Sequence, residues 1–301
     1  MKITVATADA GRVDKALARH FPGAGRRQLA DLFESGAIRI GGAIAKKGDR
    51  VVAGDVIELA HAPASGNDFR PQPDPHVALE ILLERPDVIA IAKAAGVPSQ
   101  PLRAGELGTA ANAIAARFPE CAAIGVDPRD GGLVHRLDIG TSGVLLAART
   151  AEAYSALRGA FRAGHIAKTY FALVDGRPVA SECDAPLAQR GDHVVVDHTS
   201  GLYAHTAFVV ERATSSHALV RCTAQTGRMH QIRAHLAHVG SPIAGDARYG
   251  GKPISDHPGF FLHAATLSAN WNNQSLVVIA PIPDRFTRAL AAVGLSAYLM
   301  D

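Results

Sequence analysis

The sequence predicts an α+β protein of two domains, the larger of which contains a mixed, largely antiparallel sheet flanked by helices. Its 301 residues are 48% hydrophobic and 20% charged, which is enough for about two ordinary globular domains. From residue 77 onward, apolar strand patterns replace the short helices of the N-terminal part. These strands outnumber the helices and do not alternate strictly with them, which favours a mixed or antiparallel sheet over a doubly wound one.

The first 60 residues have the pattern of a small separate unit. Apolar residues recur at helical spacing in GRVDKALARHF (11–21) and in RRQLADLFESG (26–36), and glycines follow both segments. The next segment, AIRIGGAIAKKGDRVVAGDVIEL (37–59), has the pattern of short strands joined by GG and GD turns. We therefore expect residues 1–60 to form two helices followed by a small β-hairpin sheet.

A segment rich in proline, glycine and polar residues, 61–76, follows this unit and is expected to be a linker. The second domain is then expected to span residues 77–301. Its expected strands are 77–83, 87–93, 132–138, 142–149, 168–174, 205–211 and 217–224. Its expected helices are 109–117, opened by Thr109, 151–163, opened by Thr150, and 228–239, closed by Gly240.

The positive charge is concentrated in the N-terminal unit. The chain has a net charge of +3, and residues 1–60 hold ten Lys and Arg against seven Asp and Glu, which accounts for the whole excess. A basic lobe suits capture of a nucleic acid because phosphate contacts need clustered cations. Charge alone allows an ordinary solvated surface equally well.

The sequence shows none of the features of a membrane or disulfide-stabilised protein. No apolar stretch approaches the ~20 residues that span a bilayer, and the N-terminus lacks the apolar core of a signal peptide. The three cysteines are odd in number and far apart, so neither a disulfide framework nor a zinc knuckle is indicated. We expect a cytoplasmic monomer that does not associate with membranes.

The segment GGLVHRLDIGTSGVLLAART (131–150) carries charged residues within an apolar run. Asp138 follows an expected strand at a glycine-containing turn, where a cation would keep the carboxylate ionised and able to act as a nucleophile. Arg228 and Arg233 of the expected helix 228–239 could supply that cation. Taken alone, these residues fit a structural ion pair better than a catalytic one.

Other kinds of catalytic site have little support. The chain contains no GxxxxGK loop and no GxGxxG after a strand, and Ser142 lacks the GxSxG context of a serine hydrolase. Only His235 and His238 would share a helix face, and no carboxylate in that helix completes a metal triad. We expect no metal, although a metal-dependent hydrolase using these two histidines is an alternative.

Several motifs together resemble the RluA-type pseudouridine synthases. HRLDIGTSGVLLAAR (135–149) closely resembles the family signature H-R-L-D-x-x-T-S-G. KTYFALVDG (168–176) and TGRMHQIRAHLAHVGSPIAGDARYGG (226–251) resemble its second and third motifs, and FLHAATLSANW and APIPDRF its C-terminal strands. The motifs stand in family order across residues 80–301. The resemblance implies the pseudouridine synthase fold for the second domain.

The N-terminal unit resembles the ribosomal-protein S-four type RNA-binding module through RVDKALA, FESGAIRIGG and VVAGDVIEL. This resemblance makes the basic residues of the lobe candidates for RNA contacts, namely Arg26, Arg27, Lys46 and Lys47. Gly25-Arg26 and Gly41-Gly42 stand where the module usually has Ser-Arg and Asn-Gly. In the second domain, AKAAGVPSQP (92–101) stands where the family usually has N-K-P-A-G.

The family resemblance also implies roles for individual residues. Asp138 would be the catalytic aspartate that attacks the uridine, and Arg233 the arginine that keeps it ionised. Tyr170 would stack on the target base, since a phenol is a weak base at neutral pH. Arg136 would enter the RNA in place of the flipped nucleotide. Arg228 and His230 are further candidates for RNA contacts.

The resemblance therefore implies an RNA uridine isomerase that needs no metal and no organic cofactor. Its expected partner is RNA, with large-subunit (23S-type) ribosomal RNA favoured over transfer RNA. A non-catalytic RNA-binding or ribosome-assembly factor with the same fold is the alternative from another class. The presence of Asp138, Tyr170 and Arg233 argues against that alternative, since an inactive protein would be free to lose them.

Overall fold

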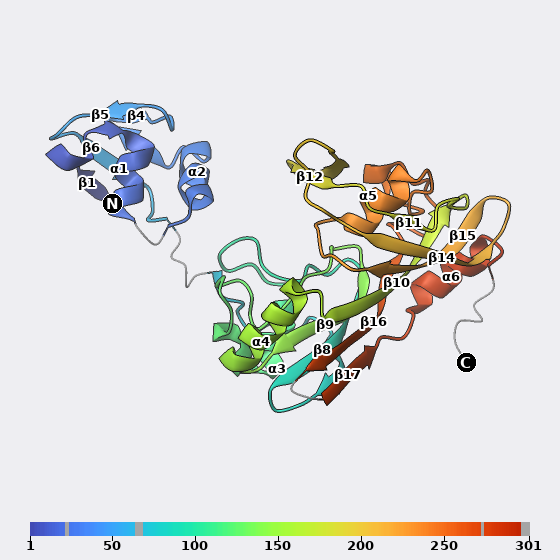
Figure 1. Ribbon diagram of the computed structural model, residues 1–301. Helices are drawn as coiled ribbons and strands as arrows, with labels where there is room; N and C mark the ends of the chain where they lie inside the picture. The colour runs from blue at the N-terminus through green and yellow to red at the C-terminus, as the bar shows by residue number, and fades with distance from the viewer. Residues whose placement is uncertain (22–23, 64–68, 272–273, 296–301) are drawn as a thin grey trace. The chain divides into compact units, whose positions relative to one another are not determined.

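The computed structural model describes residues 1–21, 24–63, 69–271 and 274–295 (Figure 1). Two units are distinguished within the chain. The first is Met1–Arg70 with Leu102–Glu106, and the second is Pro71–Pro101 with Leu107–Asp301. The division after Arg70 falls inside the segment expected to be a linker, and the domain limits expected at residues 60 and 77 remain predictions.

Two helices and a four-stranded sheet form the first unit. Its elements are β1 (Lys2–Thr4), η1 (Thr7–Asp9), β2 (Gly11–Arg12), α1 (Val13–His20), α2 (Arg26–Glu34), β3 (Ile38–Ile40), β4 (Ala43–Ile44), β5 (Arg50–Val51) and β6 (Val56–Leu59). The sheet has the order β1-β6-β3-β4, with every pair antiparallel, and β2 pairs with β5. The two predicted helices are confirmed, and β1 is a strand that the sequence pattern did not predict.

Buried apolar residues hold this unit together. Leu17 of α1 packs in one cluster with Ile38 and Ile57 of the sheet, and all three side chains are fully enclosed. Helix α2 is followed by Gly36, whose backbone lies in the left-handed region at φ +68°. Glycine adopts this conformation without steric cost, which explains why the helix stops there.

A nine-stranded sheet is the framework of the second unit. Its strands are β7 (Glu80–Glu84), β8 (Val88–Lys93), β9 (Ser142–Ala148), β10 (Ile166–Asp175), β11 (Glu182–Cys183), β14 (Thr206–Ala213), β15 (His217–Ala224), β16 (Leu262–Trp271) and β17 (Gln274–Ile279). The order is β11-β14-β15-β10-β16-β9-β8-β7, with β17 paired to β16. Among the described strands only β9 and β16 pair in parallel. The predicted mixed, largely antiparallel sheet is therefore confirmed.

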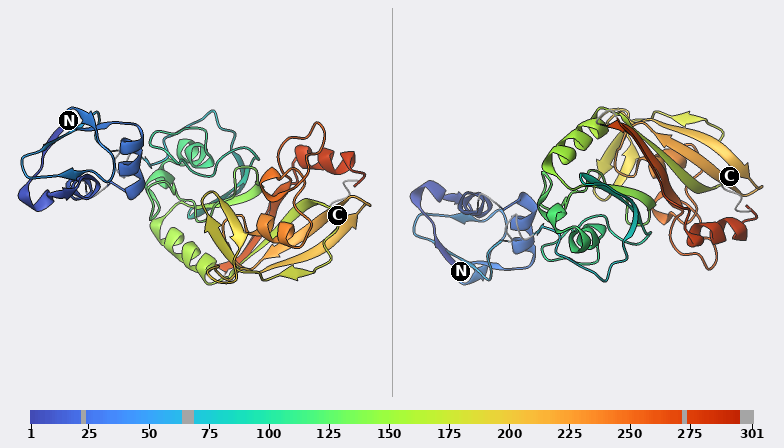
Figure 2. Two further views of the ribbon diagram at one scale, coloured as in Figure 1. Left: turned by 90° about the horizontal axis from the view of Figure 1, so that it is seen from above. Right: turned by 90° about the horizontal axis from the view of Figure 1, so that it is seen from below.

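Helices α3 (Ala110–Arg117) and α4 (Ala151–Arg162) cover opposite faces of the half of the sheet that contains β8 and β9. Successive strand residues point to opposite faces, so Val88 packs with α4 while Ile89 packs with α3. Figure 2 shows these two helices, coloured in shades of green, on either side of the strands. Each helix begins after a threonine, Thr109 or Thr150, whose hydroxyl accepts a backbone hydrogen bond.

The other half of the sheet is covered in the same way by α5 (Gln231–His238) and α6 (Asp284–Ala292). Ala172 of β10 packs in the cluster that contains α5, and Leu173 packs in the cluster that contains α6. A separate hairpin, β12 (Leu187–Arg190) with β13 (His193–Val196), lies against α5. The two halves meet where β16 lies between β10 and β9.

The segment 132–138, which we expected to be a strand, is not one. Only Leu133 forms a bridge, to Ala147. Val134 still donates its N–H to the Leu146 carbonyl at 3.2 Å, and beyond Val134 side chains take over the backbone hydrogen bonds. His135 Nε2 accepts from the Leu146 N–H at 3.0 Å, and the Ser99 hydroxyl both accepts from the Leu137 N–H and donates to the Leu137 carbonyl. Strand alternation therefore does not apply to Arg136 and Asp138.

Two other predicted boundaries were wrong. Helix α5 begins at Gln231, not at residue 228, because the Gln231 side chain accepts a hydrogen bond from the Arg228 N–H and His230 has a left-handed backbone at φ +52°. The segment APIPDRF (280–286) is not a strand: residues 280–283 form a loop that ends at Pro283, the residue that caps α6, and residues 284–286 are the first turn of that helix. Helix α6 and the β12–β13 hairpin were not predicted.

Candidate active site

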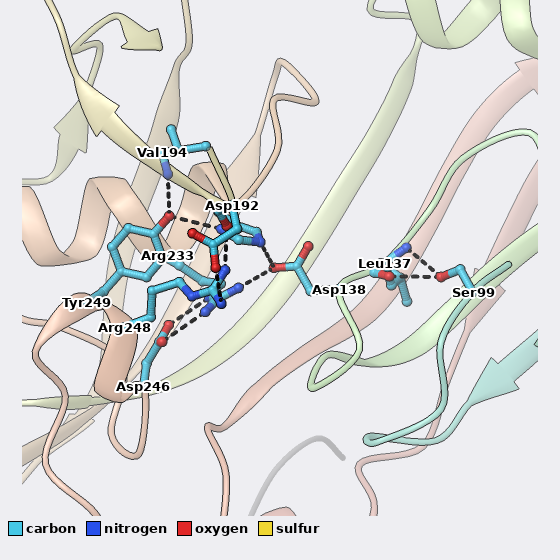
Figure 3. Close-up of polar contacts among 10 residues, drawn as sticks. Ser99, Leu137, Asp138, Asp192, Val194, Arg233, Asp246, Arg248 and Tyr249 are labelled. Atoms are coloured by element: carbon cyan, nitrogen blue, oxygen red, sulfur yellow. Dashed lines mark hydrogen bonds and ion pairs between the residues drawn. The ribbon is translucent and has the colours of Figure 1, made fainter. Parts of the chain in front are cut away.

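The central feature of the site is an ion pair between two residues that are far apart in the sequence. Asp138 lies in the loop before β9, and Arg233 lies on the first turns of α5. Arg233 Nη1 donates to Asp138 Oδ2 at 2.9 Å (Figure 3). The Arg233 side chain is only 7% exposed, whereas that of Asp138 is 26% exposed. The arginine is thus a buried cation that contacts a carboxylate which solvent can partly reach.

A second carboxylate fixes the arginine. Asp246 accepts two hydrogen bonds from Arg233, one from Nε at 2.7 Å and one from Nη2 at 2.9 Å. The guanidinium also lies over the rings of Phe260 and Tyr249, with 4.4 and 5.0 Å between its Cζ and the ring centroids. Burial alone would lower the pKa of Arg233, but the contacts with Asp246 and Asp138 outweigh this effect and raise it. Arg233 therefore stays charged and keeps a fixed orientation.

His230 and Tyr249 extend this cluster. His230 Nδ1 lies 2.9 Å from the Tyr249 hydroxyl, and His230 Nε2 lies 3.8 Å from Asp138 Oδ2. The Tyr249 hydroxyl also accepts a hydrogen bond from the Val194 N–H at 3.0 Å, as Figure 3 shows. The β12–β13 hairpin is thereby joined to the same set of residues as the proposed catalytic pair.

The loop that carries Asp138 is held by Lys93 at the end of β8, the strand next to β9. Lys93, only 3% exposed, donates from Nζ to the carbonyl of Ile139 at 3.2 Å and to those of Ala94 and Val97 at 2.9 and 2.7 Å. Burial lowers the pKa of Lys93 to about 8, and Asp138 opposes this shift. The amine is therefore charged at neutral pH, and its three acceptors fix the backbone next to Asp138.

Tyr170 lies on β10, where the two halves of the sheet meet. It pairs with Cys222 of β15 and with Ala264 of β16, and it packs against apolar clusters of both halves. Burial raises the pKa of the Tyr170 phenol, and Asp138 adds to this effect. Tyr170 therefore lies close enough to interact with the carboxylate, and it stays protonated at neutral pH, which favours stacking over a role as a base.

The other predicted RNA-contact residues are not brought together in one cluster. Arg136 is exposed and forms no hydrogen bond in the described part of the chain, and Arg228 is exposed with its Nε bonded to the Tyr203 carbonyl at 3.0 Å. Lys46 and Lys47 are exposed in the first unit. The side chains of Arg26 and Arg27 lie outside the described residues.

His235, one of the two histidines that a metal site would need, makes structural contacts with other parts of the protein. His235 is fully buried, with Nδ1 2.9 Å from the Thr206 hydroxyl and Nε2 2.9 Å from the Ala185 carbonyl. Both ring nitrogens are therefore occupied by protein partners. In the described ranges, no group of three or more His, Cys, Asp and Glu side chains is arranged to hold a metal ion. These contacts argue against a metal at His235 and His238.

Asp246, Tyr249 and Lys93 belong to the site, but sequence reasoning gave them no role. Asp246 and Tyr249 lie in DARYGG, at the end of the third motif, and Lys93 lies in the segment 92–101 that departs from the family pattern. No spacing rule connects Asp246 with Arg233, which are 13 residues apart on different elements. Membership of a matched motif was the only available signal.

These features form a candidate active site built around a partly exposed carboxylate and a buried arginine. Residues 87–238 match the RNA pseudouridylate synthase family. Ribosomal large subunit pseudouridine synthase D of Xanthomonas campestris is 32% identical over 94% of this chain and 88% of its own. The Xylella fastidiosa protein of the same name is 34% identical over 96% and 91%. The chain belongs to the RNA pseudouridylate synthase family.

Solved structures agree with the fold. Human RNA pseudouridylate synthase domain containing 4 aligns with a TM-score of 0.59 at 22% identity, over 71% of this chain and 93% of that one. Human RNA pseudouridylate synthase domain containing 1 aligns with a TM-score of 0.54 at 25% identity, over 70% and 86%. The pseudouridine synthase fold predicted for the second domain is confirmed. No helix in the described part of the chain has the length and apolar character to cross a membrane.

Proposed function

We propose that this pseudouridine synthase modifies specific uridines of large-subunit ribosomal RNA, with Asp138 as the nucleophile. The contact between Arg233 Nη1 and Asp138 Oδ2 supports this role most directly, because a buried cation stabilises the charged, nucleophilic form of a carboxylate that solvent can still reach. The RNA class follows from the relatives named for the large ribosomal subunit, which match nearly the whole chain.

The reaction is a redox-neutral isomerisation. The bond between the ribose anomeric carbon and N1 of uracil breaks, and a bond from the same carbon to C5 forms. C5 loses a proton and N1 gains one, so atoms and electrons balance without a co-reactant. If Asp138 attacks the anomeric carbon, it displaces N1 with the bonding electron pair, and the Asp138–ribose bond breaks when C5 attacks the same carbon. If Asp138 instead adds to the uracil ring, the Asp138–ring bond breaks after the ribose has moved from N1 to C5. We expect no metal and no organic cofactor.

Three further residues of the second unit have proposed roles. Tyr170 would stack on the target base next to Asp138, which its position on β10 and its protonated phenol support. Arg136 is exposed and forms no hydrogen bond in the described ranges, so its guanidinium is available to occupy the space left by a flipped nucleotide. Arg228 is an exposed cation that would contact phosphate.

For the first unit we propose RNA binding of the ribosomal-protein S-four type. A pocket of about 280 Å³ is lined by Asp9, Ala10, Gly11, Arg12, Lys15, Arg19 and Arg50. Arg12 pairs with Asp14 and Arg19 with Asp9. Lys15 and Arg50 form no ion pair in the described part of the chain and are exposed, so they can receive phosphate groups together with Lys46 and Lys47. A cytoplasmic location and a monomeric state remain predictions.

The decisive experiment maps pseudouridine in total RNA from a strain that lacks this protein. We expect the loss of one or a few modifications in large-subunit ribosomal RNA, restored by the wild-type chain and not by Asp138→Asn. Losses confined to transfer RNA would contradict the proposed substrate class. An unchanged map would instead support the non-catalytic RNA-binding alternative.

A further inference from the structure

His230 lies between Tyr249 and Asp138 and has little contact with solvent. Only 12% of its side chain is exposed, and its backbone lies in the left-handed region at φ +52°. Residues other than glycine adopt this conformation rarely, and histidine, asparagine and aspartate do so most readily. A residue that only contacted RNA phosphates would need neither this backbone nor this burial. The contacts of the imidazole therefore suggest a role within the site.

The Tyr249 hydroxyl determines which imidazole nitrogen carries the proton. A phenol has one hydrogen to donate and can accept others. The Tyr249 oxygen accepts from the Val194 N–H at 3.0 Å, and its only other partner among the described residues is His230 Nδ1 at 2.9 Å. The phenol therefore donates to Nδ1. A neutral His230 then carries its proton on Nε2, the nitrogen that faces Asp138.

The surroundings keep this imidazole neutral. The charged and polar side chains that face it are Asp138, Arg233, Asp246, Arg248 and Tyr249. Burial lowers the pKa of His230, the arginines lower it further, and the two aspartates oppose these effects, so that the pKa lies below its usual value. At neutral pH the group facing Asp138 is therefore an uncharged N–H donor.

The two oxygens of Asp138 have different surroundings. Oδ2 receives the hydrogen bond from Arg233 Nη1 and lies 3.8 Å from His230 Nε2. Oδ1 forms no hydrogen bond within the described residues, and Figure 3 shows that it carries no dashed line. At 3.8 Å the histidine contact is electrostatic rather than a hydrogen bond. Rotating the carboxylate to exchange its oxygens would move Oδ2 away from both donors.

We propose that His230 is a positioning residue for Asp138. With its proton fixed on Nε2 by Tyr249, it acts with Arg233 on Oδ2 and leaves Oδ1 as the oxygen that attacks the uridine. This inference rests on the proposed role of Asp138 as the nucleophile. Arg233 stabilises the charge of Asp138, and His230 fixes the rotation of the carboxylate.

Two substitutions separate this role from a structural one. His230→Asn keeps a residue that tolerates the left-handed backbone and a polar atom near the position of Nδ1, but it leaves the position of Nε2 empty. His230→Gln can place an amide N–H near that position. We expect kcat for His230→Asn to fall by up to about 100-fold with KM within twofold, and His230→Gln to recover part of that loss. Thermal unfolding identifies any variant that fails to fold.

The tautomer can be observed without activity. In a 1H–15N spectrum of the histidine side chains of the full-length wild-type protein, assigned by through-bond correlation of each ring with its own backbone, we expect His230 to be protonated on Nε2 only. In Tyr249→Phe, which has lost the donor to Nδ1, we expect a mixture of tautomers. Because this spectrum needs no folded variant of His230, it tests the proposal even if His230→Asn is unstable.

The outcomes distinguish this inference from the proposed function. Turnover by Asp138→Asn would contradict the nucleophile itself. An inactive Asp138→Asn combined with full kcat in a folded His230→Asn would contradict the positioning role alone. A wild-type spectrum with the proton on Nδ1 would also overturn the proposal. Equal kcat losses in the Asn and Gln variants would mean that an N–H donor at the Nε2 position is not what matters, and would overturn it as well.

Discussion

Arg233 divides its guanidinium unequally between two carboxylates, with two hydrogen bonds to Asp246 and one to Asp138. Asp246 is 2% exposed, whereas Asp138 is 26% exposed. The buried carboxylate therefore holds the arginine in a fixed orientation, and the accessible one contacts a cation that is already in place. Such pre-organisation reduces the free energy that substrate binding must supply to orient the reacting groups.

Asp138→Asn should abolish isomerisation and leave RNA affinity nearly unchanged. The amide keeps the shape of the side chain but is not a nucleophile, so we expect turnover to fall by roughly 10⁴-fold or more. Asp256→Asn is a matched control, because Asp256 is exposed and its left-handed backbone tolerates asparagine. Both variants should be tested for single-turnover conversion and for binding to the same ribosomal RNA fragment. A difference in affinity alone would not fit a nucleophile.

Asp246→Asn should lower stability and turnover together. It leaves the buried Arg233 with only one charged partner, and removing one member of a buried ion pair costs about 3 kcal/mol. Urea unfolding of the two proteins measures the loss of free energy. Asp192→Asn is the control, since Asp192 pairs with Arg248 at an exposed position and exposed pairs contribute little. Similar losses in both variants would argue against a special role for the buried pair.

Stability should decrease below pH 6.5 through His135. Burial lowers the pKa of His135 to about 3 from the usual 6.5. Between these values the unfolded chain binds a proton that the folded chain does not, so stability falls by about 1.4 kcal/mol for each pH unit of acidification. His135→Gln keeps an acceptor for the Leu146 N–H but does not titrate. Between pH 6 and 5, wild type should lose about 1.4 kcal/mol more than this variant, and parallel losses would contradict the prediction.

Replacing Lys15 and Arg50 with alanine should weaken RNA binding and reduce its salt dependence. Each lost phosphate contact should reduce the log–log slope by about 0.7 to 0.9. Lys2→Ala is a matched control, because Lys2 is an exposed cation of the same unit that already pairs with Glu58 at 2.6 Å. Affinity for a ribosomal RNA fragment should be measured at several salt concentrations. An unchanged slope in the double variant would mean that the pocket is only a solvated surface.

Gly143→Ala should destabilise the second unit severely. Gly143 has φ +116°, and a Cβ there would lie 2.1 Å from the Ala264 carbonyl oxygen. Strain and collision at this position should cost about 3 kcal/mol or more. Gly159→Ala is the control, because Gly159 lies within α4 with open space around it, and this change should stabilise the helix by up to about 1 kcal/mol. Thermal unfolding distinguishes the two results.

Local pattern was sufficient to predict most of the fold. The strand at 142–149 was evident because every residue of β9 is buried, which produces a continuous apolar run. The segment 132–138 looks the same in sequence, but the Ser99 hydroxyl binds its backbone at Leu137. This tertiary interaction leaves no periodic trace in the segment itself. The helix start at Gln231 was missed for a similar reason, because the Gln231 side chain accepts the hydrogen bond of the Arg228 N–H just before the helix begins.

The candidate site was predicted less completely than the fold. The family motifs pointed to Asp138 and Arg233, which the structure joins across 95 residues. Asp246 and Tyr249 were missed because each belongs to the site through a contact with another side chain, Arg233 or His230, and no recognisable sequence spacing marks these contacts. For His230 we predicted only an RNA contact. Its role beside Asp138 was missed because sequence alone shows neither the burial of a histidine nor its tautomer. Such features become visible only when the neighbours of a side chain in space are known.

The position of β16 has a consequence for biosynthesis. This strand lies between β10 and β9, yet it is made after both of them and after Arg233. A nascent chain that ends before Leu262 would contain Asp138, Tyr170 and Arg233 but lack the strand that joins the two halves. The sheet can therefore be completed only after this late segment has been made, and a chain that terminates before Leu262 holds every proposed catalytic residue without the strand that joins the two halves.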